Sequence, residues 1–450
     1  MINPQIFREY DIRGIAEQDL VDENVYLMGC GFGTYYQSLG NKTVIVGHDV
    51  RLSSPRVSDS LKKGLVDSGC DVLDIGEVPT PALYFALFHF KLDSGIMITA
   101  SHNPKEFNGF KVCAGKSTIY GEEIQQLRKI IEKKVFTKGQ GKIDKSKIIP
   151  DYIKYVTKDI KIKRGLKIVL DTGNGTCGPI AEQIMEKIGA DCQILYKEPD
   201  GNFPNHLPDP TVLKFMGKLV EAVKKGGYAC GVGYDGDGDR IGVIDETGKV
   251  IWGDVLLAIY AAEVLKLNPG ATIIFEVKCS KGLIERISQL GGVPLMYKTG
   301  HSLIKAKMKE EHALLAGEMS GHMFFSDRYH GYDDAIYASL RLLEILSKGK
   351  KLSELAAQVP HYFSTPEIRV ETTDEKKFAI VDGLKASFMK SYKVIDIDGV
   401  RVDFGDGWGL VRASNTQPVL VLRFEAKTKD RLEEIESLFL DNLRKLGINA

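Results

Sequence analysis

The sequence predicts an α/β protein with three similar mixed-sheet α/β domains and a smaller C-terminal α+β domain. A short apolar run followed by a polar or glycine-rich loop recurs in three successive blocks, and after Pro366 the pattern changes to closely spaced strands. Apolar runs that alternate with helical stretches are typical of βαβ units in a parallel or mixed sheet covered by helices. The length of 450 residues agrees, because it suffices for several domains that each bury a core.

The first block contains two strand runs. The run 43–46 is followed by Gly47-His48-Asp49 and then by a helical stretch from Pro55 to Asp67. The run 95–98 leads into Thr-Ala-Ser-His-Asn-Pro at 99–104. Ligands of such sheets bind beyond the carboxyl ends of the strands, so we expect the chemistry in these loops.

The next two blocks repeat this pattern with four strand runs, at 168–170, 231–234, 272–275 and 313–316. Two of the loops that follow are rich in polar groups: Asp-Gly-Asp-Gly-Asp-Arg at 235–240 and Gly-Glu-Met-Ser-Gly-His at 317–322. We expect both loops to lie at the edges of sheets where ligands bind.

The last segment reads as a small α+β domain. Its strand runs and its final amphipathic helix are expected at 368–370, 400–404, 410–412, 419–424 and 429–446. We predict domains at 1–150, 151–254, 255–365 and 366–450.

Composition excludes several partners. The 60 basic residues balance the 60 acidic ones, and the formal net charge is zero. No overall field then attracts nucleic acid or an anionic membrane, so we expect neither as a partner, and no protein partner is implied.

The cysteines and the apolar segments point to the cytoplasm. Seven cysteines are scattered without a Cys-x-x-Cys pair, which argues against a disulfide framework and a zinc site. No signal peptide is expected, because Arg8, Glu9 and Asp11 come early. The apolar stretch 255–265 is shorter than the ~20 residues of a membrane span. We therefore expect a cytoplasmic protein with reduced thiols.

Three aspartates at alternate positions, Asp235, Asp237 and Asp239, indicate a metal site. The glycines between them allow a tight turn in which the carboxylates converge, and without a cation three carboxylates would repel one another. Oxygen ligands suit Mg²⁺, which keeps positions open for water or phosphate. An EF-hand is rejected, because Arg240 stands where that loop requires glycine and the flanks read as strands.

Ser101 lies at a strand end, in a turn formed by Asn103 and Pro104. We expect its side chain to be exposed, and an isolated serine in such a turn is usually a helix cap. The adjacent His102 suggests a hydrolase, but neighbouring side chains usually diverge and the chain has no Gly-x-Ser-x-Gly elbow. A Ser-His-Asp hydrolase is therefore not expected.

The segment 412–416, Arg-Ala-Ser-Asn-Thr, follows a strand and offers the groups that bind a phosphate, with Arg423 on the next strand. Alone it is weak evidence, since polar loops after strands are common. Four lone basic residues are solvated or structural charges unless a loop places them in a site: Arg13, Lys111, Lys278 and His301.

Four of these segments, 99–104, 235–240, 317–322 and 412–416, occur in the order found in the α-D-phosphohexomutases. The third segment, with Lys-Thr-Gly-His at 298–301, resembles the bacterial phosphomannomutase/phosphoglucomutase branch. The resemblance extends from Tyr10 to Glu425, nearly the whole chain. Four motifs in one order are far more specific than any one of them.

The resemblance implies four domains around a central cleft and a role for each matching residue. Ser101 would be the phosphoserine and would hold Mg²⁺ together with the three aspartates. Lys111 and His301 would transfer protons, and Arg240 would neutralise charge beside the phosphoserine. The residues implied to bind the sugar, line its site or hold the phosphate that does not react are Tyr10, Arg13, Lys278, Glu318, Ser320, His322, Arg412, Ser414, Asn415, Thr416 and Arg423.

The implied reaction passes the phosphate of Ser101 to the free hydroxyl of a hexose monophosphate. This gives a hexose 1,6-bisphosphate, which acts as intermediate and activator, and after the sugar reorients its other phosphate returns to Ser101. If Glu318 and Ser320 hold the 3- and 4-hydroxyls, mannose and glucose should both be accepted, since they differ only at the 2-hydroxyl.

Two alternatives remain open from the sequence. In a metal-dependent sugar-phosphate phosphatase, an aspartate of the 235–240 loop would be the nucleophile and Ser101 would carry no phosphate. A non-catalytic sugar-phosphate sensor would bind its ligand through the loop at Arg412, and S101A would leave its function intact.

Overall fold

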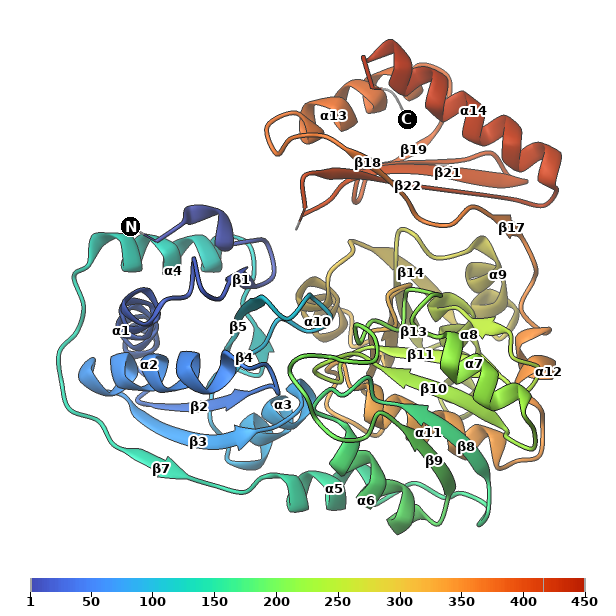
Figure 1. The fold of residues 1–450 in the computed structure, drawn as a ribbon. Helices are drawn as coiled ribbons and strands as arrows, with labels where there is room; N and C mark the ends of the chain where they lie inside the picture. Colours follow the sequence, from blue (N-terminus) through green and yellow to red (C-terminus); the bar gives the residue numbers. More distant parts are fainter. Residues whose placement is uncertain (1, 416, 449–450) are drawn as a thin grey trace. The chain divides into compact units, whose positions relative to one another are not determined.

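The computed structural model of this chain describes residues 2–415 and 417–448. Two compact units are present: one comprises 1–253 with 320–355, the other 254–319 with 356–450. Three mixed or parallel sheets and an antiparallel C-terminal sheet confirm the predicted fold class (Figure 1). The four domain boundaries stay predictions.

The N-terminal sheet of the first unit has the order β1-β5-β4-β2-β3-β7, with β6 beside β5. β2 runs parallel to β3 and β4, whereas β5 is antiparallel to β4 and β1. The strands are β1 (Ile12–Ile15), β2 (Thr43–His48), β3 (Asp71–Glu77), β4 (Ser94–Ile98), β5 (Phe107–Ala114), β6 (Ser117–Thr118) and β7 (Ile143–Lys145). The loop at Ser101 thus joins two antiparallel neighbours.

Helices cover both faces of this sheet (Figure 1). α1 packs against α2 and α4, while α3 contacts β2 and β4. α1 and α2 approach closely because Gly29 and Gly64 face each other, and a Cβ at Gly29 would lie 2.4 Å from the carbonyl oxygen of Leu61. The segments are η1 (Pro4–Ile6), α1 (Asp22–Ser38), α2 (Ser54–Asp67), α3 (Thr80–His89), α4 (Glu122–Lys133) and α5 (Ile149–Thr157).

The second sheet of this unit has the order β12-β11-β10-β8-β9. Its elements are β8 (Lys167–Asp171), α6 (Gly178–Ile188), β9 (Asp191–Leu195), α7 (Gly217–Lys224), β10 (Cys230–Tyr234), β11 (Ile241–Asp245) and β12 (Val250–Ile251). The aspartate loop joins the antiparallel strands β10 and β11, so the rejection of an EF-hand is confirmed. β16 (Met323–Phe325) and α11 (Ala335–Leu346) also belong to this unit.

The second unit contains the parallel strands β14, β13 and β15. Its helices and strands up to residue 317 are α8 (Gly253–Leu267), β13 (Thr272–Glu276), α9 (Lys281–Gln289), β14 (Val293–Tyr297), α10 (His301–Glu310) and β15 (Leu315–Gly317). The strand predicted at 313–316 begins two residues later, because the Ala313 N–H donates to the carbonyl of Met308 and completes the end of α10.

The C-terminal sheet is antiparallel, with the order β17-β22-β21-β20-β19 and β18 also beside β22. Buried side chains of α13 and α14 form one core with β20, β21 and β22. The elements are α12 (Leu352–Ala356), β17 (Phe363–Ser364), β18 (Ile368–Glu371), α13 (Lys377–Phe388), β19 (Val394–Ile395), β20 (Val400–Asp403), β21 (Gly407–Ala413), β22 (Val419–Ala426) and α14 (Lys429–Lys445). Thr428 caps α14 by accepting from the N–H of Arg431.

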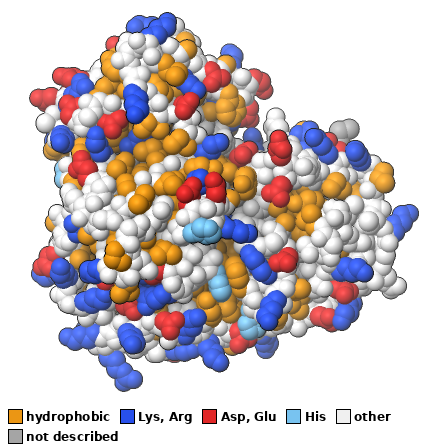
Figure 2. Space-filling model, turned by 180° about the vertical axis from the view of Figure 1, so that it is seen from behind, with side chains coloured by type: hydrophobic (Ala, Val, Ile, Leu, Met, Phe, Trp, Pro, Cys, Tyr) orange, Lys and Arg blue, Asp and Glu red, His pale blue; other side chains and the backbone are white. Residues whose placement is uncertain are grey.

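The surface and the cysteines fit the composition. Figure 2 shows acidic and basic side chains interspersed over one face, in keeping with the zero net charge. All seven cysteines are free thiols. Among residues 2–415 and 417–448, no helix has the length and apolar character needed to cross a membrane.

A buried carboxylate, Asp334, caps α11 in the first unit. Its Oδ1 accepts from the N–H of Tyr337 at 2.8 Å, and its Oδ2 accepts from the hydroxyls of Tyr152 at 2.9 Å and Tyr329 at 2.7 Å. Burial raises the pKa of Asp334 from 3.8 to about 6, although these hydrogen bonds favour the ionised form.

The stability of the protein should therefore fall as the pH rises from about 4 to 6. The folded form holds the Asp334 proton more tightly than the unfolded chain, so this contribution is complete below the lower pKa and is lost as the pH passes the higher one. Its size is about 3 kcal/mol. Urea unfolding of the native protein and D334N at several pH values checks this: the difference between them should change over this range, and a constant difference contradicts the assignment.

Candidate active site

Ser101 lies at the end of β4 with its side chain buried, so the expectation of an exposed serine is wrong. Its backbone has a φ of +51°, in the left-handed region. The loop packs against the aspartate loop, where Gly236 is required because a Cβ would lie 2.5 Å from the Ser101 carbonyl oxygen. The hydroxyl of Ser101 donates to Asp235 Oδ2 at 2.6 Å. The structure thus places the predicted nucleophile directly on the predicted metal ligands.

Ligand oxygens of the three aspartates all lie within 4.8 Å of one another, and all three residues are fully buried. Oδ1 of Asp237 and Oδ1 of Asp239 have no hydrogen-bond partner among the described residues. Buried carboxylate oxygens are normally paired, and a group of this kind is what a hard divalent cation binds. The donor set therefore fits Mg²⁺.

The charges in this cluster are unevenly compensated. Burial beside two other carboxylates raises the pKa of Asp235 well above its usual range. For Asp237, burial is outweighed by the Lys111 ammonium and by the Thr80 hydroxyl, which lower its pKa. Lys111 donates to Asp237 Oδ2 at 2.8 Å and also contacts Asp239 Oδ2. Oδ1 of Asp237 and Oδ1 of Asp239 are the oxygens that a bound cation would neutralise.

His102 contacts Ser101, contrary to the expectation that their side chains diverge. Its Nδ1 is 3.0 Å from Ser101 Oγ and its Nε2 is 3.5 Å from Nη1 of Arg240. The left-handed backbone at Ser101 turns the two side chains together. Because a guanidinium only donates, Nε2 accepts and Nδ1–H faces the serine. Burial and the nearby Arg240 lower the pKa of His102, so the ring is neutral.

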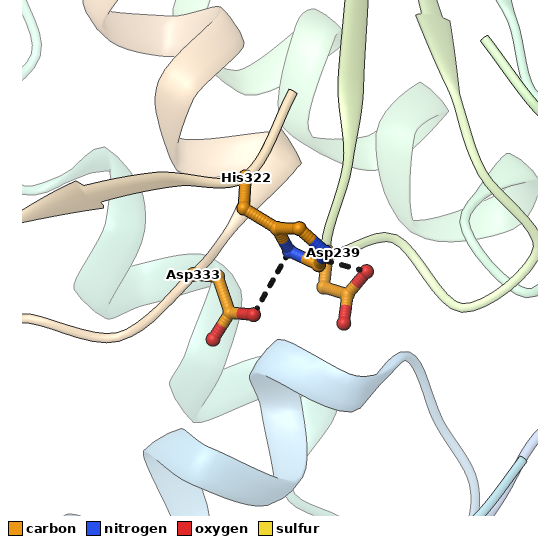
Figure 3. A group of neighbouring side chains, drawn as sticks. All are labelled: Asp239, His322 and Asp333. Carbon is orange, nitrogen blue, oxygen red and sulfur yellow. Dashed lines mark ion pairs between the residues drawn. The ribbon is translucent and has the colours of Figure 1, made fainter. Parts of the chain in front are cut away.

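Arg240 contacts His322, and Figure 3 shows this histidine between Asp333 and Asp239. Its Nε donates to His322 Nε2 at 2.9 Å, and His322 Nδ1 lies 3.0 Å from Asp333 Oδ2 and 3.7 Å from Asp239 Oδ1. The acidic residues face Nδ1, which leaves Nε2 as the acceptor for Arg240. On the other side of Ser101, Arg13 donates to Asn103 Oδ1 at 2.9 Å. Tyr10 is buried close to Arg13 in the chain.

In the second unit, Glu276 organises the loops that follow the parallel strands. Oε2 of this fully buried residue accepts from the N–H of Lys278 at 2.7 Å and from the hydroxyl of Thr299 at 2.9 Å. Its Oε1 accepts from the N–H of Met319 at 3.2 Å. One carboxylate thus brings together the loops that carry Lys278, His301 and Glu318.

The loops at Gly300, Glu318 and Arg412 are linked in the same way. Glu318 Oε1 accepts from the N–H of Gly300 at 2.5 Å, and Asp398 Oδ2 accepts both from the N–H of Thr299 and from Arg412 Nε, each at 3.0 Å. His301 is buried with its Nδ1 3.2 Å from Lys305 Nζ.

The loop that follows Arg412 is supported by a buried lysine, Lys377. Lys377 Nζ donates to the carbonyl oxygens of Ser414 at 2.6 Å and Gln417 at 3.2 Å. Asn415 is half-buried, and Thr416 lies outside the described residues. Arg423 is buried with its Nη2 3.8 Å from Asp254 Oδ2.

The sequence analysis predicted the charged residues of the motifs. It missed the residues that hold them in place through hydrogen bonds. The sequence analysis did not predict a role for Glu276, Asp398, Asp333 or Lys377. It also did not predict the contact between His102 and Ser101. For Glu276 a signal was available, because a carboxylate at the end of an apolar strand run is buried only where it has partners. Ser320 is half-buried in the first unit.

Family models match four successive segments of the chain. They describe phosphoglucomutase/phosphomannomutase α/β/α domain I at residues 4–138, domain II at 150–248, domain III at 252–363 and the C-terminal domain at 367–441. Together they cover most of the 450 residues.

Relatives that match over nearly their whole length support the same family. A phosphomannomutase/phosphoglucomutase of Pseudomonas aeruginosa is 48% identical over 441 residues, which is 98% of this chain and 95% of that protein. A phosphoglucomutase of Neisseria meningitidis is 44% identical over 96% of this chain and 95% of its own length. A crystal structure of a phosphoglucomutase/phosphomannomutase family protein from Burkholderia thailandensis superposes with a TM-score of 0.94 at 41% identity, covering 100% and 99% of the two chains. With the four matching domain models, these likenesses show that the chain belongs to the phosphoglucomutase/phosphomannomutase family of α-D-phosphohexomutases.

Proposed function

We propose that this protein is a phosphomannomutase/phosphoglucomutase that interconverts hexose 1-phosphates and hexose 6-phosphates through a phosphoserine at Ser101. The observation that carries the proposal is the 2.6 Å hydrogen bond from Ser101 Oγ to Asp235 in a buried cluster with two unpartnered carboxylate oxygens among the described residues. A hydroxyl needs such surroundings to carry a phosphoryl group, because the dianion must be neutralised where it is formed and released.

Residues of the first unit have the roles of phosphoryl transfer. Asp235, Asp237 and Asp239 would hold Mg²⁺ together with an oxygen on Ser101. When bound, the cation would supply charge neutralisation for the phosphoryl group. Arg240 adds a second positive charge whose direction is fixed by His322. This arrangement stabilises charge that spreads over the phosphoryl oxygens during transfer.

Two residues are proposed for proton transfer at the sugar hydroxyl, Lys111 and His301. Lys111 is charged beside the aspartates, and the carboxylates Asp237 and Asp239 raise its pKa against the effect of burial. Its ammonium group carries the proton that would be donated to the sugar oxygen when the phosphoryl group leaves that oxygen. His301 is proposed to accept a proton, because an imidazole nitrogen can act as a general base.

The roles of substrate binding are proposed for residues of the second unit and for four residues of the first unit, Tyr10, Arg13, Ser320 and His322. Arg412, Ser414, Asn415, Thr416 and Arg423 would bind the phosphate that is not transferred, through charge-assisted hydrogen bonds. The residues proposed to bind the sugar or line its site are Tyr10, Arg13, Lys278, Glu318, Ser320 and His322. A hexose 1,6-bisphosphate would be both the intermediate and the activator that restores the phosphate on Ser101.

Mass analysis of Ser101 tests this function. The purified protein is treated with glucose 1,6-bisphosphate, and the peptide containing Ser101 is examined for phosphate before and after a chase with glucose 1-phosphate. We expect the phosphate to leave the peptide and to appear in bisphosphate. Steady release of inorganic phosphate without a phosphopeptide would indicate the phosphatase, and binding without any transfer would indicate the sensor. We place the reaction in the cytoplasm, which the free thiols favour.

Both glucose 1-phosphate and mannose 1-phosphate should be substrates, with kcat/KM values within about a thousandfold of each other. Loss of one hydroxyl hydrogen bond costs about 0.5–1.5 kcal/mol, whereas a thousandfold difference needs about 4 kcal/mol. Galactose 1-phosphate is the matched control, because its inverted 4-hydroxyl removes a contact assigned to Glu318 and Ser320. Steady-state assays decide, and a larger preference between the first two sugars contradicts these contacts.

A further inference from the structure

Arg51, in the loop between β2 and α2, bonds four carbonyl oxygens of the segment that carries Ser101. Its Nη2 donates to the carbonyls of Ser101 at 2.8 Å and Asn103 at 2.7 Å. Its Nη1 donates to those of Pro104 at 2.7 Å and Phe107 at 3.0 Å. A single guanidinium therefore bonds four backbone carbonyls between Ser101 and the first residue of β5, Phe107.

The guanidinium of Arg51 is itself held in place by Asp49. Asp49 Oδ2 accepts from Arg51 Nε at 3.1 Å, while Oδ1 accepts from the N–H of Arg51 at 3.0 Å and from the hydroxyl of Ser54 at 2.5 Å. The ring of Phe203 lies 5.3 Å from the guanidinium carbon. The arginine is 1% exposed. All five of its donors have an acceptor, so the buried charge has one orientation.

The segment it holds includes a strained residue. Ser101 has a φ of +51°, which a residue with a Cβ adopts at a cost of about 1–2 kcal/mol. Such a conformation persists only where the surroundings over-determine it, and strain of this kind collects at functional sites. Here the carbonyl oxygen of Ser101 accepts a hydrogen bond from Arg51, and the hydroxyl of Ser101 donates one to Asp235.

We propose that Arg51 is a positioning residue for phosphoryl transfer: it holds the 101–107 segment so that Ser101 Oγ meets the metal-binding aspartates. This rests on the proposed function. Arg51 contacts only backbone oxygens of this segment and so is not itself a catalytic residue. Arginine is required because its planar fork offers five donors in fixed directions, whereas lysine offers three from one atom.

The test compares R51K with the native protein. R51K keeps the charge but loses the fork, so we expect kcat to fall about 100-fold, since a misplacement of about 1 Å at reacting atoms costs that much. KM for glucose 1-phosphate should stay within about threefold, because Arg51 binds no substrate. After treatment with glucose 1,6-bisphosphate, the ³¹P resonance of phosphoserine 101 should move from its native position.

R341K is the matched control. Arg341 is also buried in the first unit, where it makes two hydrogen bonds of 2.8 Å to Asp327 and contacts neither Ser101 nor the aspartate loop. We expect R341K to lower thermal stability to a similar degree, with kcat and the ³¹P resonance unchanged. A loss of kcat in both variants would assign the effect to general destabilisation and overturn the proposal.

If R51K does not fold, the D49N variant is tested in its place. The amide retains the volume of Asp49 but weakens its hold on Arg51, so a smaller fall in kcat and a smaller ³¹P shift are expected. Native kcat and an unmoved resonance in either folded variant overturn the inference. Failure of the proposed function gives a different result, since the native protein would then carry no phosphate on Ser101.

Discussion

The S101A variant is expected to lose mutase activity by at least about 10⁴-fold, because alanine lacks the hydroxyl that is proposed to carry the phosphoryl group. The hydroxyl of Ser101 is buried and already bonded to Asp235, and the neighbouring His102 is a neutral donor to it. Alanine removes the nucleophile without adding volume. The measurements are kcat with glucose 1-phosphate and incorporation of phosphate from glucose 1,6-bisphosphate.

S94A is the matched control for S101A. Ser94 begins the same strand, β4, and its buried hydroxyl has no hydrogen-bond partner among the described residues. Its removal should therefore leave both activity and stability close to native. If S101A retained sugar-phosphate turnover with release of inorganic phosphate, the nucleophile would be elsewhere and the phosphatase reading would gain support.

The residues that carry charge could be predicted from the sequence, because their spacing reflects local geometry. Alternating aspartates and glycines at 235–239 converge within a few residues, and the two flanking strand runs show as apolar segments. The fold class followed from the same strand runs. The four matched motifs then placed the remaining residues by resemblance.

The surroundings of Ser101 could not be predicted in this way. Its burial depends on Gly236, more than a hundred residues away in the chain, and the contact with His102 depends on a single backbone angle. Arg51 reads in the sequence as one more charged loop residue. Its partners are backbone oxygens, which leave no trace in the side chains of the segment that it holds.

In the second unit, too, the residues that hold the motif residues in place could not be predicted from the sequence. Glu276 and Asp398 lie more than a hundred residues apart, and both bond Thr299. Carboxylates of this kind position loops through backbone N–H groups, so residue type alone does not separate them from surface acids. In both units, charged residues that the motifs do not contain orient, through hydrogen bonds, the residues that the motifs identify.

Removal of divalent metal should abolish activity, and D239N should weaken metal binding by more than about 100-fold. Even loss of an outer-shell partner of a metal typically costs about 10–100-fold in affinity, and Asp239 is proposed to bind the cation directly. Treatment with EDTA should remove the activity of the native protein, and added Mg²⁺ should restore it. Calorimetric titration with Mn²⁺ measures the affinity of each variant without relying on turnover.

D245N separates metal binding from stability. Asp245 ends β11, only six residues beyond Asp239, and its Oδ1 accepts from the backbone N–H groups of Thr247 at 2.9 Å and Lys249 at 2.9 Å. It is buried like the three aspartates of the 235–240 loop, but its carboxylate faces a turn. We expect D245N to lower the free energy of unfolding and to bind Mn²⁺ like the native protein. If D239N also bound Mn²⁺ normally, the unpartnered oxygens of Asp237 and Asp239 would not mark the cation site, and neutralisation at Ser101 would fall to Arg240 and Lys111 alone.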